Sequence, residues 1–322
     1  MTVYTLGDLH GVLGIAPSPQ ARLRQLVGLL LPQMIEQGPP LRRSAGWHVA
    51  EIRTAVEHGR ADVFFDDYGR PAGSLLWKWL DDAGEAAVLA GAEVTETQAA
   101  AQGSAWVAHF HARHVGLRHV LRCVQPAIAA RAEEIAYARV RNRRRTAKQV
   151  RVPQLRAARR ACSQPSFLGR DAGRQLRAEA IALLSEAQRL GDWLLLATGN
   201  QVFARWAPSD LLAALLMPLR LGNFVEVPGP DDTLHAFLAY GLLTPDGLER
   251  LARQGPMALS PACFSEGDVM AALCAGAAED ASVEAELALR VARRHAGQRR
   301  MLRGAGIAAL DRLDRDSAAH QA

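Results

Sequence analysis

Two stretches of the chain show the same succession of apolar patterns. In the first stretch, apolar residues spaced three and four apart give way to short apolar runs bounded by turn residues. We predict helices over residues 20–37 and 47–58, then strands over residues 63–65, 72–80 and 106–111. Pro32 is expected to kink or end the first helix, and residues 66–69 have the composition of a hairpin turn. Residues 83–103 are predicted as a helix or a long loop.

The second stretch repeats this order. It predicts helices over residues 177–196 and 209–217 and strands over residues 224–227 and 234–240. Trp47 and Trp206, which we take as anchors, lie 159 positions apart, a distance typical of a domain duplication rather than of a solenoid repeat. We therefore expect two copies of one module that pack together as an intramolecular pseudo-dimer.

The regions outside these modules are predicted to be mainly helical. They are residues 128–148, read as a long basic helix, and residues 246–315. The fold class is then α/β, with an α+β order in each half: a small, mostly antiparallel sheet flanked by helices. The expected boundaries are residues 1–150 for the first domain, 151–178 for a basic linker or helix, and 179–322 for the second domain.

Composition narrows the setting. The chain has 322 residues, of which 49% are hydrophobic, enough for two domains. No apolar run reaches the length of a membrane helix, and the first residues do not resemble a signal peptide. The four cysteines are scattered without metal-binding spacing. We expect a cytoplasmic protein that does not associate with a membrane.

Positive charge is concentrated in one segment. Residues 113–177 carry seventeen Arg and Lys residues against three acidic ones, a local net charge of +14 in a chain of net charge +5. Such a segment attracts acidic partners, or it forms a solvated face between domains. Nucleic acid is an unlikely partner, because Tyr137 is the one aromatic residue close to the densest basic run.

Short motifs in both halves resemble the toxin-activating lysine-acyltransferases, which have an N-acetyltransferase-like fold. The first half contains Tyr-Gly-Arg-Pro at residues 68–71, a tryptophan six residues later at Trp77, and Gly-Ser-Ala-Trp-Val-Ala at residues 103–108. The second half contains Leu-Gly-Asp-Trp at residues 190–193, followed by Arg-Trp, Leu-Leu-Ala and Leu-His-Ala-Phe. Together the similarities cover residues 26–125 and 190–285.

This resemblance implies transfer of a fatty acyl group to a lysine of a protein substrate, with acyl-carrier protein or acyl-coenzyme A as donor and no resident cofactor. The histidine of the family's catalytic pair corresponds to Ser44 and Phe203, and its aspartate to His109 and Ala272, so neither half keeps the pair. His109 is the predicted base, since imidazole titrates near neutral pH, and the second half is expected to be a scaffold.

The remaining site predictions follow from residue type and position. Trp77 is expected to line an acyl channel, with core packing as the alternative. Arg42 is a candidate for substrate binding, and Arg143 and Arg144 are candidates for docking the acidic carrier protein. His109, His111 and His114 lack a nearby carboxylate, so no metal site is predicted. Strand alternation predicts His109 and His111 on one face, opposite Trp106 and Phe110.

Two other functions remain open at this point. The chain could be a binding protein that has kept the fold and lost catalysis. It could also be a coenzyme A-dependent N-acetyltransferase, because residues 303–308 loosely fit an anion-binding glycine motif.

Overall fold

A computed structural model describes residues 4–37, 41–95, 104–112, 120–121, 128–129, 132–141, 144–152, 173–229, 233–264, 267–278 and 302–304. The chain divides into two compact units. Unit 1 comprises Met1–Arg43 and His48–Gly191, and unit 2 comprises Ser44–Trp47 and Asp192–Ala322.

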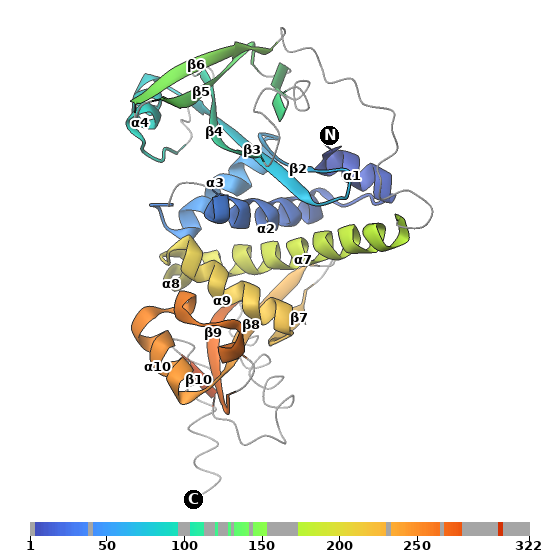
Figure 1. Cartoon of the computed structure of the whole chain (residues 1–322), viewed down its shortest axis with the longest axis vertical. Helices are drawn as coiled ribbons and strands as arrows, with labels where there is room; N and C mark the ends of the chain where they lie inside the picture. The colour runs from blue at the N-terminus through green and yellow to red at the C-terminus, as the bar shows by residue number, and fades with distance from the viewer. Residues whose placement is uncertain are drawn as a thin grey trace, which may run out of the picture. The chain divides into compact units, whose positions relative to one another are not determined.

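Unit 1 combines helices with a six-stranded mixed sheet (Figure 1). Its helices are α1 (Leu6–Leu13), α2 (Pro19–Gln37), most of α3 (Ala45–Glu57), α4 (Asp82–Ala90) and the first part of α7 (Gly173–Gly199). Its strands are β1 (Tyr4–Thr5), β2 (Ala61–Phe65), β3 (Pro71–Leu80), β4 (Ser104–Ala112), β5 (Glu134–Arg141) and β6 (Arg144–Arg151). Pro32 lies within α2 without ending it. The prediction of a mixed α/β chain is confirmed.

The strands of this sheet follow one another in chain order, and neighbours are antiparallel except β4 and β5. The parallel pair is short, since it joins residues 105–107 of β4 to residues 135–137 of β5. Beyond these positions β4 continues along β3, and β5 continues along β6. The two parallel strands are therefore paired at their beginnings and have different partners afterwards.

A β-bulge in β4 lies at the place where this pairing ends. Val107 is opposite Trp77 and His109 is opposite Leu76, so Ala108 is the additional residue. The bulge shifts the alternation of side chains: Val107 and Phe110 pack in one core cluster, whereas Trp106 packs in another. The prediction that Trp106 and Phe110 share a face is wrong for this reason.

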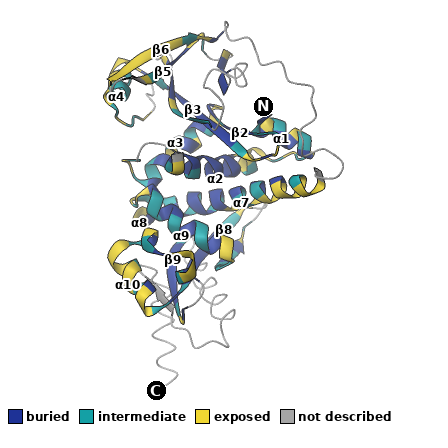
Figure 2. Ribbon diagram, in the orientation of Figure 1, coloured by how far each residue is buried: buried dark blue, intermediate teal, exposed yellow. Residues whose placement is uncertain are grey.

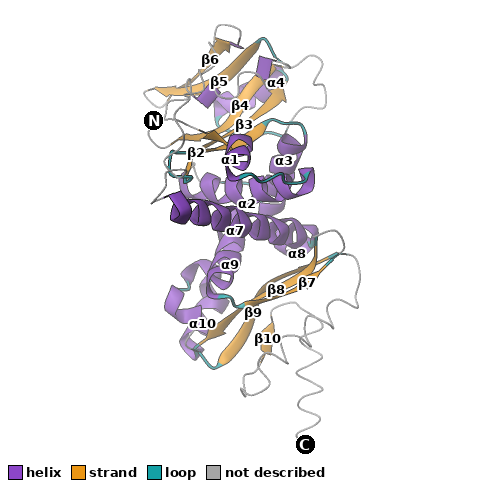
Figure 3. Cartoon of the chain, turned by 90° about the vertical axis from the view of Figure 1, so that its right-hand side faces the viewer, coloured by secondary structure: helices purple, strands orange, loops and turns teal. Residues whose placement is uncertain are grey.

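Unit 2 contains the last part of α7 together with α8 (Gln201–Ala204), α9 (Pro208–Leu221), α10 (Pro245–Gln254), and the 3-10 turns η3 (Pro256–Ala258) and η4 (Pro261–Phe264). Its strands are β7 (Phe224–Pro228), β8 (Leu234–Leu243), β9 (Val269–Ala277) and β10 (Leu302–Gly304). In Figure 3, β7, β8 and β9 lie side by side with α9 and α10 to one side of them.

One plan occurs twice along the chain, from α2 to β4 and from α7 to β9: two helices followed by three antiparallel strands. From α7 to β8, positions lie 163 residues after their counterparts in α2 to β3, since the Trp77 N–H donates to the Arg60 carbonyl just as the Tyr240 N–H donates to the Asn223 carbonyl. In β9 the offset from β4 is 165, because Ala272 is opposite Tyr240 as Val107 is opposite Trp77. Bulges also recur at matching places, after Leu76 and after Ala239. Trp47 and Trp206, separated by 159 positions, are therefore not equivalent.

The first helix of each plan, α2 or α7, contains a glycine at corresponding positions, and the two glycines meet within unit 1. A Cβ on Gly28 would lie 1.9 Å from the Ala187 carbonyl oxygen, and a Cβ on Gly191 would lie 1.9 Å from the Arg24 carbonyl oxygen. Gln25 and Gln188, also corresponding residues, are hydrogen-bonded at 3.4 Å. Only glycine permits this approach of two helix backbones.

Two predicted helical regions are wrong in part, although α10 confirms the start of the second one. Of the predicted basic helix over residues 128–148, residues 134–141 form β5 and residues 144–148 belong to β6, because Ile135 and Tyr137 pack in the core on one face of β5. β6 is exposed along almost its whole length, as its yellow colour in Figure 2 shows. In the C-terminal region, β9 is a buried strand of small apolar residues. Such residues pack closely in a sheet although they favour helices when exposed.

Candidate functional site

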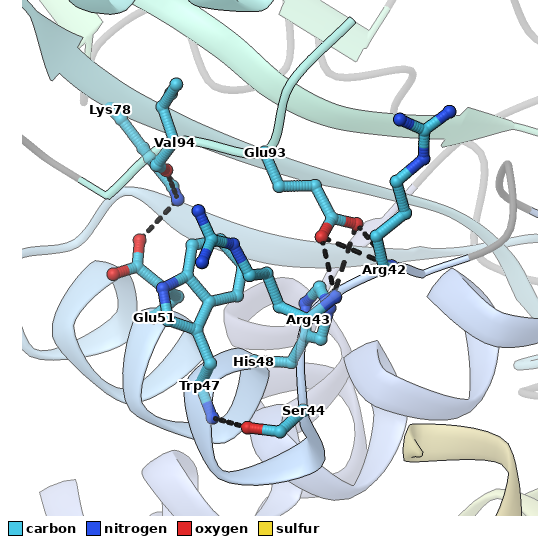
Figure 4. A network of polar contacts seen from close by, with 9 residues as sticks. All are labelled: Arg42, Arg43, Ser44, Trp47, His48, Glu51, Lys78, Glu93 and Val94. Atoms are coloured by element: carbon cyan, nitrogen blue, oxygen red, sulfur yellow. Dashed lines mark hydrogen bonds and ion pairs between the residues drawn. The ribbon is translucent and has the colours of Figure 1, made fainter.

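Buried ionisable side chains gather on the face of β3 that α3 covers (Figure 4). The Lys78 ammonium forms an ion pair with Glu51 of α3 and donates to the Val94 carbonyl oxygen at 2.7 Å. The side chains of Lys78 and Glu51 are 7% and 13% exposed. Burial lowers the pKa of Lys78, and the Glu51 carboxylate opposes this shift. Three polar groups thus meet where a sheet would ordinarily bury apolar ones.

Glu93 extends this network toward the start of α3. Its carboxylate accepts hydrogen bonds from the backbone N–H groups of Arg42, at 3.2 Å, and Arg43, at 2.9 Å. It lies 3.8 Å from Nε2 of His48, whose side chain is 2% exposed. Burial lowers the pKa of His48 to about 4, with the nearby Glu93 raising it and Lys78 lowering it. His48 is therefore neutral at pH 7.

A serine–histidine pair lies on the same face of the sheet. Nε2 of His109 is 3.1 Å from the Ser74 hydroxyl oxygen, and Ser74 is fully buried. Burial lowers the pKa of His109 to about 4, with smaller contributions from His111 and His48. The contact with Ser74 fixes the ring orientation, and a neutral imidazole keeps one nitrogen able to accept a proton. His109 immediately follows the bulge at Ala108.

The corresponding positions in unit 2 carry no such chemistry. They hold Leu211 for His48, Ala214 for Glu51, Phe237 for Ser74, Gly241 for Lys78 and Cys274 for His109. The leucine, alanine, phenylalanine and cysteine are buried, and burial raises the pKa of the Cys274 thiol. Cys274, rather than Ala272, is thus the counterpart of His109, because Ala272 is opposite Tyr240 as Val107 is opposite Trp77.

The predicted site residues are only partly brought together. His109 belongs to the polar cluster, and Arg42 touches it through its backbone, while its guanidinium points away from Glu93 in Figure 4. The Ser44 hydroxyl accepts from the Trp47 N–H at 3.4 Å at the start of α3, and Ser44 belongs to unit 2 whereas His109 belongs to unit 1. Ser44 therefore has the role of a helix cap.

Of the two docking candidates, only Arg144 is among the described residues. Arg144 is exposed on β6, and Arg143 lies outside the described residues. With Arg145, Lys148 and Arg151, Arg144 makes β6 a strongly basic strand. Arg145 also donates to the Val88 carbonyl oxygen, and Arg151 pairs with Glu134.

Trp77 is 2% exposed and packs in the core cluster, and it also lines a cavity of about 500 Å³ in unit 1. The cavity is bounded by α2, the connection from α3 to β2, and β3. Trp77 is thus both a core residue and a wall of the cavity. The ring of Trp79 lies edge-on to it at 5.7 Å.

The described residues show neither a metal cluster nor a glycine motif at the start of a helix. Among the described residues, no group of three metal-binding side chains is present; His114 lies outside them. Of the glycine motif at residues 303–308, Arg303 and Gly304 are described, and both are extended and paired with β9 rather than starting a helix. None of the helices that the structure describes has the length and apolar character needed to cross a bilayer.

Sequence reasoning missed Ser74, His48, Glu51, Lys78 and Glu93. A signal was present for Lys78, a charged residue in a strand that is otherwise almost wholly apolar. The others come together only when α3 folds over the sheet. Scans of protein-family models, curated proteins and solved structures each found no match for the chain.

Proposed function

We propose that unit 1 carries an acyl-transfer site at His109 and that unit 2 is a related, non-catalytic unit. The observation that carries this proposal is the contrast between corresponding positions: the buried polar cluster of unit 1 is replaced in unit 2 by apolar residues and a buried thiol. Unit 2 supports the same plan of helices and strands without these polar groups.

This contrast bears on function because buried ionisable groups cost stability. A buried ion pair is often no more stabilising than apolar residues of similar volume, and groups with perturbed pKa values gather at functional sites. Since the plan needs none of these groups in unit 2, a functional reason for keeping them in unit 1 is the simplest explanation. The mostly antiparallel sheet, the matched element order and the offset of 163 positions support a tandem duplication of an N-acetyltransferase-like module.

The geometry near His109 suits a transfer reaction. β4 leaves its pairing with β5 after Val107, and the bulge at Ala108 turns the strand there. His109 is the next residue and is intermediate in exposure; under this proposal the substrate amine reaches the imidazole there. Ser74 holds the imidazole, which makes Ser74 a positioning residue.

The chemistry asked of His109 is a proton transfer. The amine nitrogen of the acceptor lysine attacks the thioester carbonyl carbon, a C–N bond forms, and the C–S bond breaks. The neutral imidazole takes the proton that the amine loses and returns it to the departing thiolate. General acid–base help of this kind contributes about 10²–10⁴-fold, and holding the reactants together contributes more.

The donor we propose is acyl-carrier protein, with acyl-coenzyme A as the alternative. Arg144, Arg145, Lys148 and Arg151 give the exposed strand β6 a field that would attract an acidic carrier. β6 is an edge strand of the sheet that carries His109, so the proposed docking strand and the proposed base belong to one sheet.

A non-catalytic binding protein is the second candidate, and one observation favours it. Both His48 and His109 have a pKa of about 4, well below the neutral value that suits a general base. Under this alternative the polar cluster would recognise a partner without transferring a group to it.

The test is mass spectrometry of the purified chain incubated with palmitoyl-acyl-carrier protein and a protoxin that contains glycine-rich calcium repeats. Acyl transfer predicts a palmitoyl mass increase on a protoxin lysine, lost in His109→Ala and kept in His58→Ala, which changes an exposed histidine of the same unit. Equal product from His109→Ala would exclude His109 as the base. Binding of the carrier without any mass increase would favour the second candidate.

A further inference from the structure

The cavity of about 500 Å³ in unit 1 shares no residue with the polar cluster around His109. Its volume is within the range of small-molecule sites. Part of its wall is apolar, formed by Leu23 and Leu26 of α2 and by Leu75 and Trp77 of β3. It therefore offers an apolar surface large enough for a short hydrocarbon chain.

Two guanidinium groups line the same cavity. Arg22 is exposed on α2, and Arg60 lies before β2 with its guanidinium 5.9 Å from the centre of the Trp77 ring. Two acidic residues also lie in the wall and offset these charges in part. Glu57 is bound at 2.8 Å to Arg53, which is not in the wall. Burial raises the pKa of Asp62 to about 6, with Arg22 opposing the rise, so Asp62 carries most of its charge at pH 7 and offsets one of the two guanidinium groups.

The charged residues of the cavity are not required by the fold. The positions 163 residues later, which correspond to Arg22, Arg60 and Asp62 in the second copy of the plan, hold Ser185, Asn223 and Val225. The Asn223 amide donates to the Phe264 carbonyl oxygen, so it serves the structure of its own unit. An arginine placed at the edge of an apolar cavity points instead to a ligand with a negative charge.

We propose that this cavity binds a small amphiphilic anion, a carboxylate or phosphate monoester with a short apolar chain. Arg22 and Arg60 hold the anionic group, and Leu23, Leu26 and Trp77 contact the chain. The site shares no residue with the polar cluster around His109, and Trp77, which the sequence predicts to line an acyl channel, is the one predicted site residue in its wall.

The test is isothermal titration calorimetry of the full chain with four compounds: octanoate, octyl phosphate, octylamine and inorganic phosphate. We expect octanoate or octyl phosphate to bind at least about ten-fold more tightly than octylamine, because the guanidinium groups repel an ammonium. Inorganic phosphate is expected to bind weakly, since it lacks the chain. The stronger of the two anions identifies the head group as carboxylate or phosphate.

Two variants locate the site. Arg22→Gln is expected to weaken binding of the preferred anion about ten-fold, because a charge-assisted hydrogen bond is lost, and Arg22 is exposed, so the change spares the core. Ser185→Ala, at the corresponding position of α7, is expected to leave the affinity unchanged. The proposal is overturned if neither anion binds, if octylamine binds as tightly, or if Arg22→Gln binds the anion as tightly as the unsubstituted chain.

Discussion

Removal of Glu51 leaves the buried ammonium of Lys78 without its carboxylate partner. The variant tests whether the buried charges of the polar cluster lower the free energy of unfolding. The ion pair lies between α3 and β3, with side chains 13% and 7% exposed. Two unit charges 4 Å apart at an effective dielectric constant of 20 attract by about 4 kcal/mol. Breaking a buried pair by removing one partner costs about 3–5 kcal/mol. We expect Glu51→Ala to lower the free energy of unfolding by about this amount.

The double variant Glu51→Ala/Lys78→Met separates the charge from the packing. Both charges are then absent, as at the corresponding Ala214 and Gly241 of unit 2. Replacing a buried pair with apolar residues is often neutral or stabilising, so we expect the double variant to recover most of the lost stability. The coupling between the two substitutions should exceed about 2 kcal/mol.

The assay is urea unfolding followed by circular dichroism and tryptophan fluorescence, with Arg53→Ala as control. Arg53 and Glu57 form an exposed pair on the same helix, and its loss should cost less than about 0.5 kcal/mol. The reasoning is refuted if Glu51→Ala costs under about 1 kcal/mol, or if the double variant costs the sum of the single ones.

The pH dependence of Glu51→Ala gives a further check with a definite sign. Burial already lowers the pKa of Lys78, and removing the carboxylate that raises this pKa lowers it further. The folded variant then favours the neutral amine of Lys78. The loss in free energy of unfolding is therefore complete at pH values below the pKa of Lys78 in the folded variant, and it diminishes as the pH rises toward the pKa of an unfolded lysine, about 10.4. The destabilisation should be larger at pH 6 than at pH 9.

Three other expectations concern separate parts of the molecule. Gly28→Ala should destabilise the chain by at least about 1–3 kcal/mol in urea unfolding, because its Cβ would collide with a backbone carbonyl of α7; Gly11→Ala, where a Cβ meets nothing within 4 Å, should not, and equal losses would contradict the close approach. Asp62→Asn should stabilise the chain at pH 7 by up to about 3 kcal/mol and have little effect below pH 4. Burial raises the pKa of Asp62 from 3.8 to about 6, so the cost of ionising this carboxyl in the folded state is absent below pH 4 and complete above pH 6. An unchanged melting temperature at pH 7 would refute this. The double change Arg144→Glu/Arg145→Glu should weaken binding of acyl-carrier protein at least about ten-fold in low salt, with a smaller effect in high salt; unchanged affinity in a titration would remove β6 as the docking strand.

The repeated order of helices and strands could be predicted because it depends on local periodicity. Helix α2 and strands β2, β3 and β4 follow apolar patterns that each segment carries in itself. The prediction for β5 and β6 failed because arginine and lysine are compatible with exposed helix and exposed strand alike. The pairing of β5 with β4, between segments far apart in the sequence, decided the outcome.

The candidate site was harder to predict because it is assembled from distant segments. His109 was recognised as a titratable residue on a strand, but its partner Ser74 lies on the neighbouring strand, and His48 comes from a helix. A single bulge at Ala108 then changed which side chains share its face. The alternation of side chains along a strand does not predict where a β-bulge adds an unpaired residue.

The most direct test of a catalytic unit 1 and a non-catalytic unit 2 replaces each member of one pair of corresponding residues, His109 and Cys274. Transfer of palmitate from acyl-carrier protein to a protoxin lysine would be followed by mass spectrometry for the unsubstituted chain, for His109→Cys, which introduces the residue found in unit 2, and for Cys274→Ala. The account predicts transfer by the unsubstituted chain and by Cys274→Ala, and a loss of at least about 100-fold in His109→Cys. Full transfer by His109→Cys, or loss in Cys274→Ala with the fold intact, would contradict it.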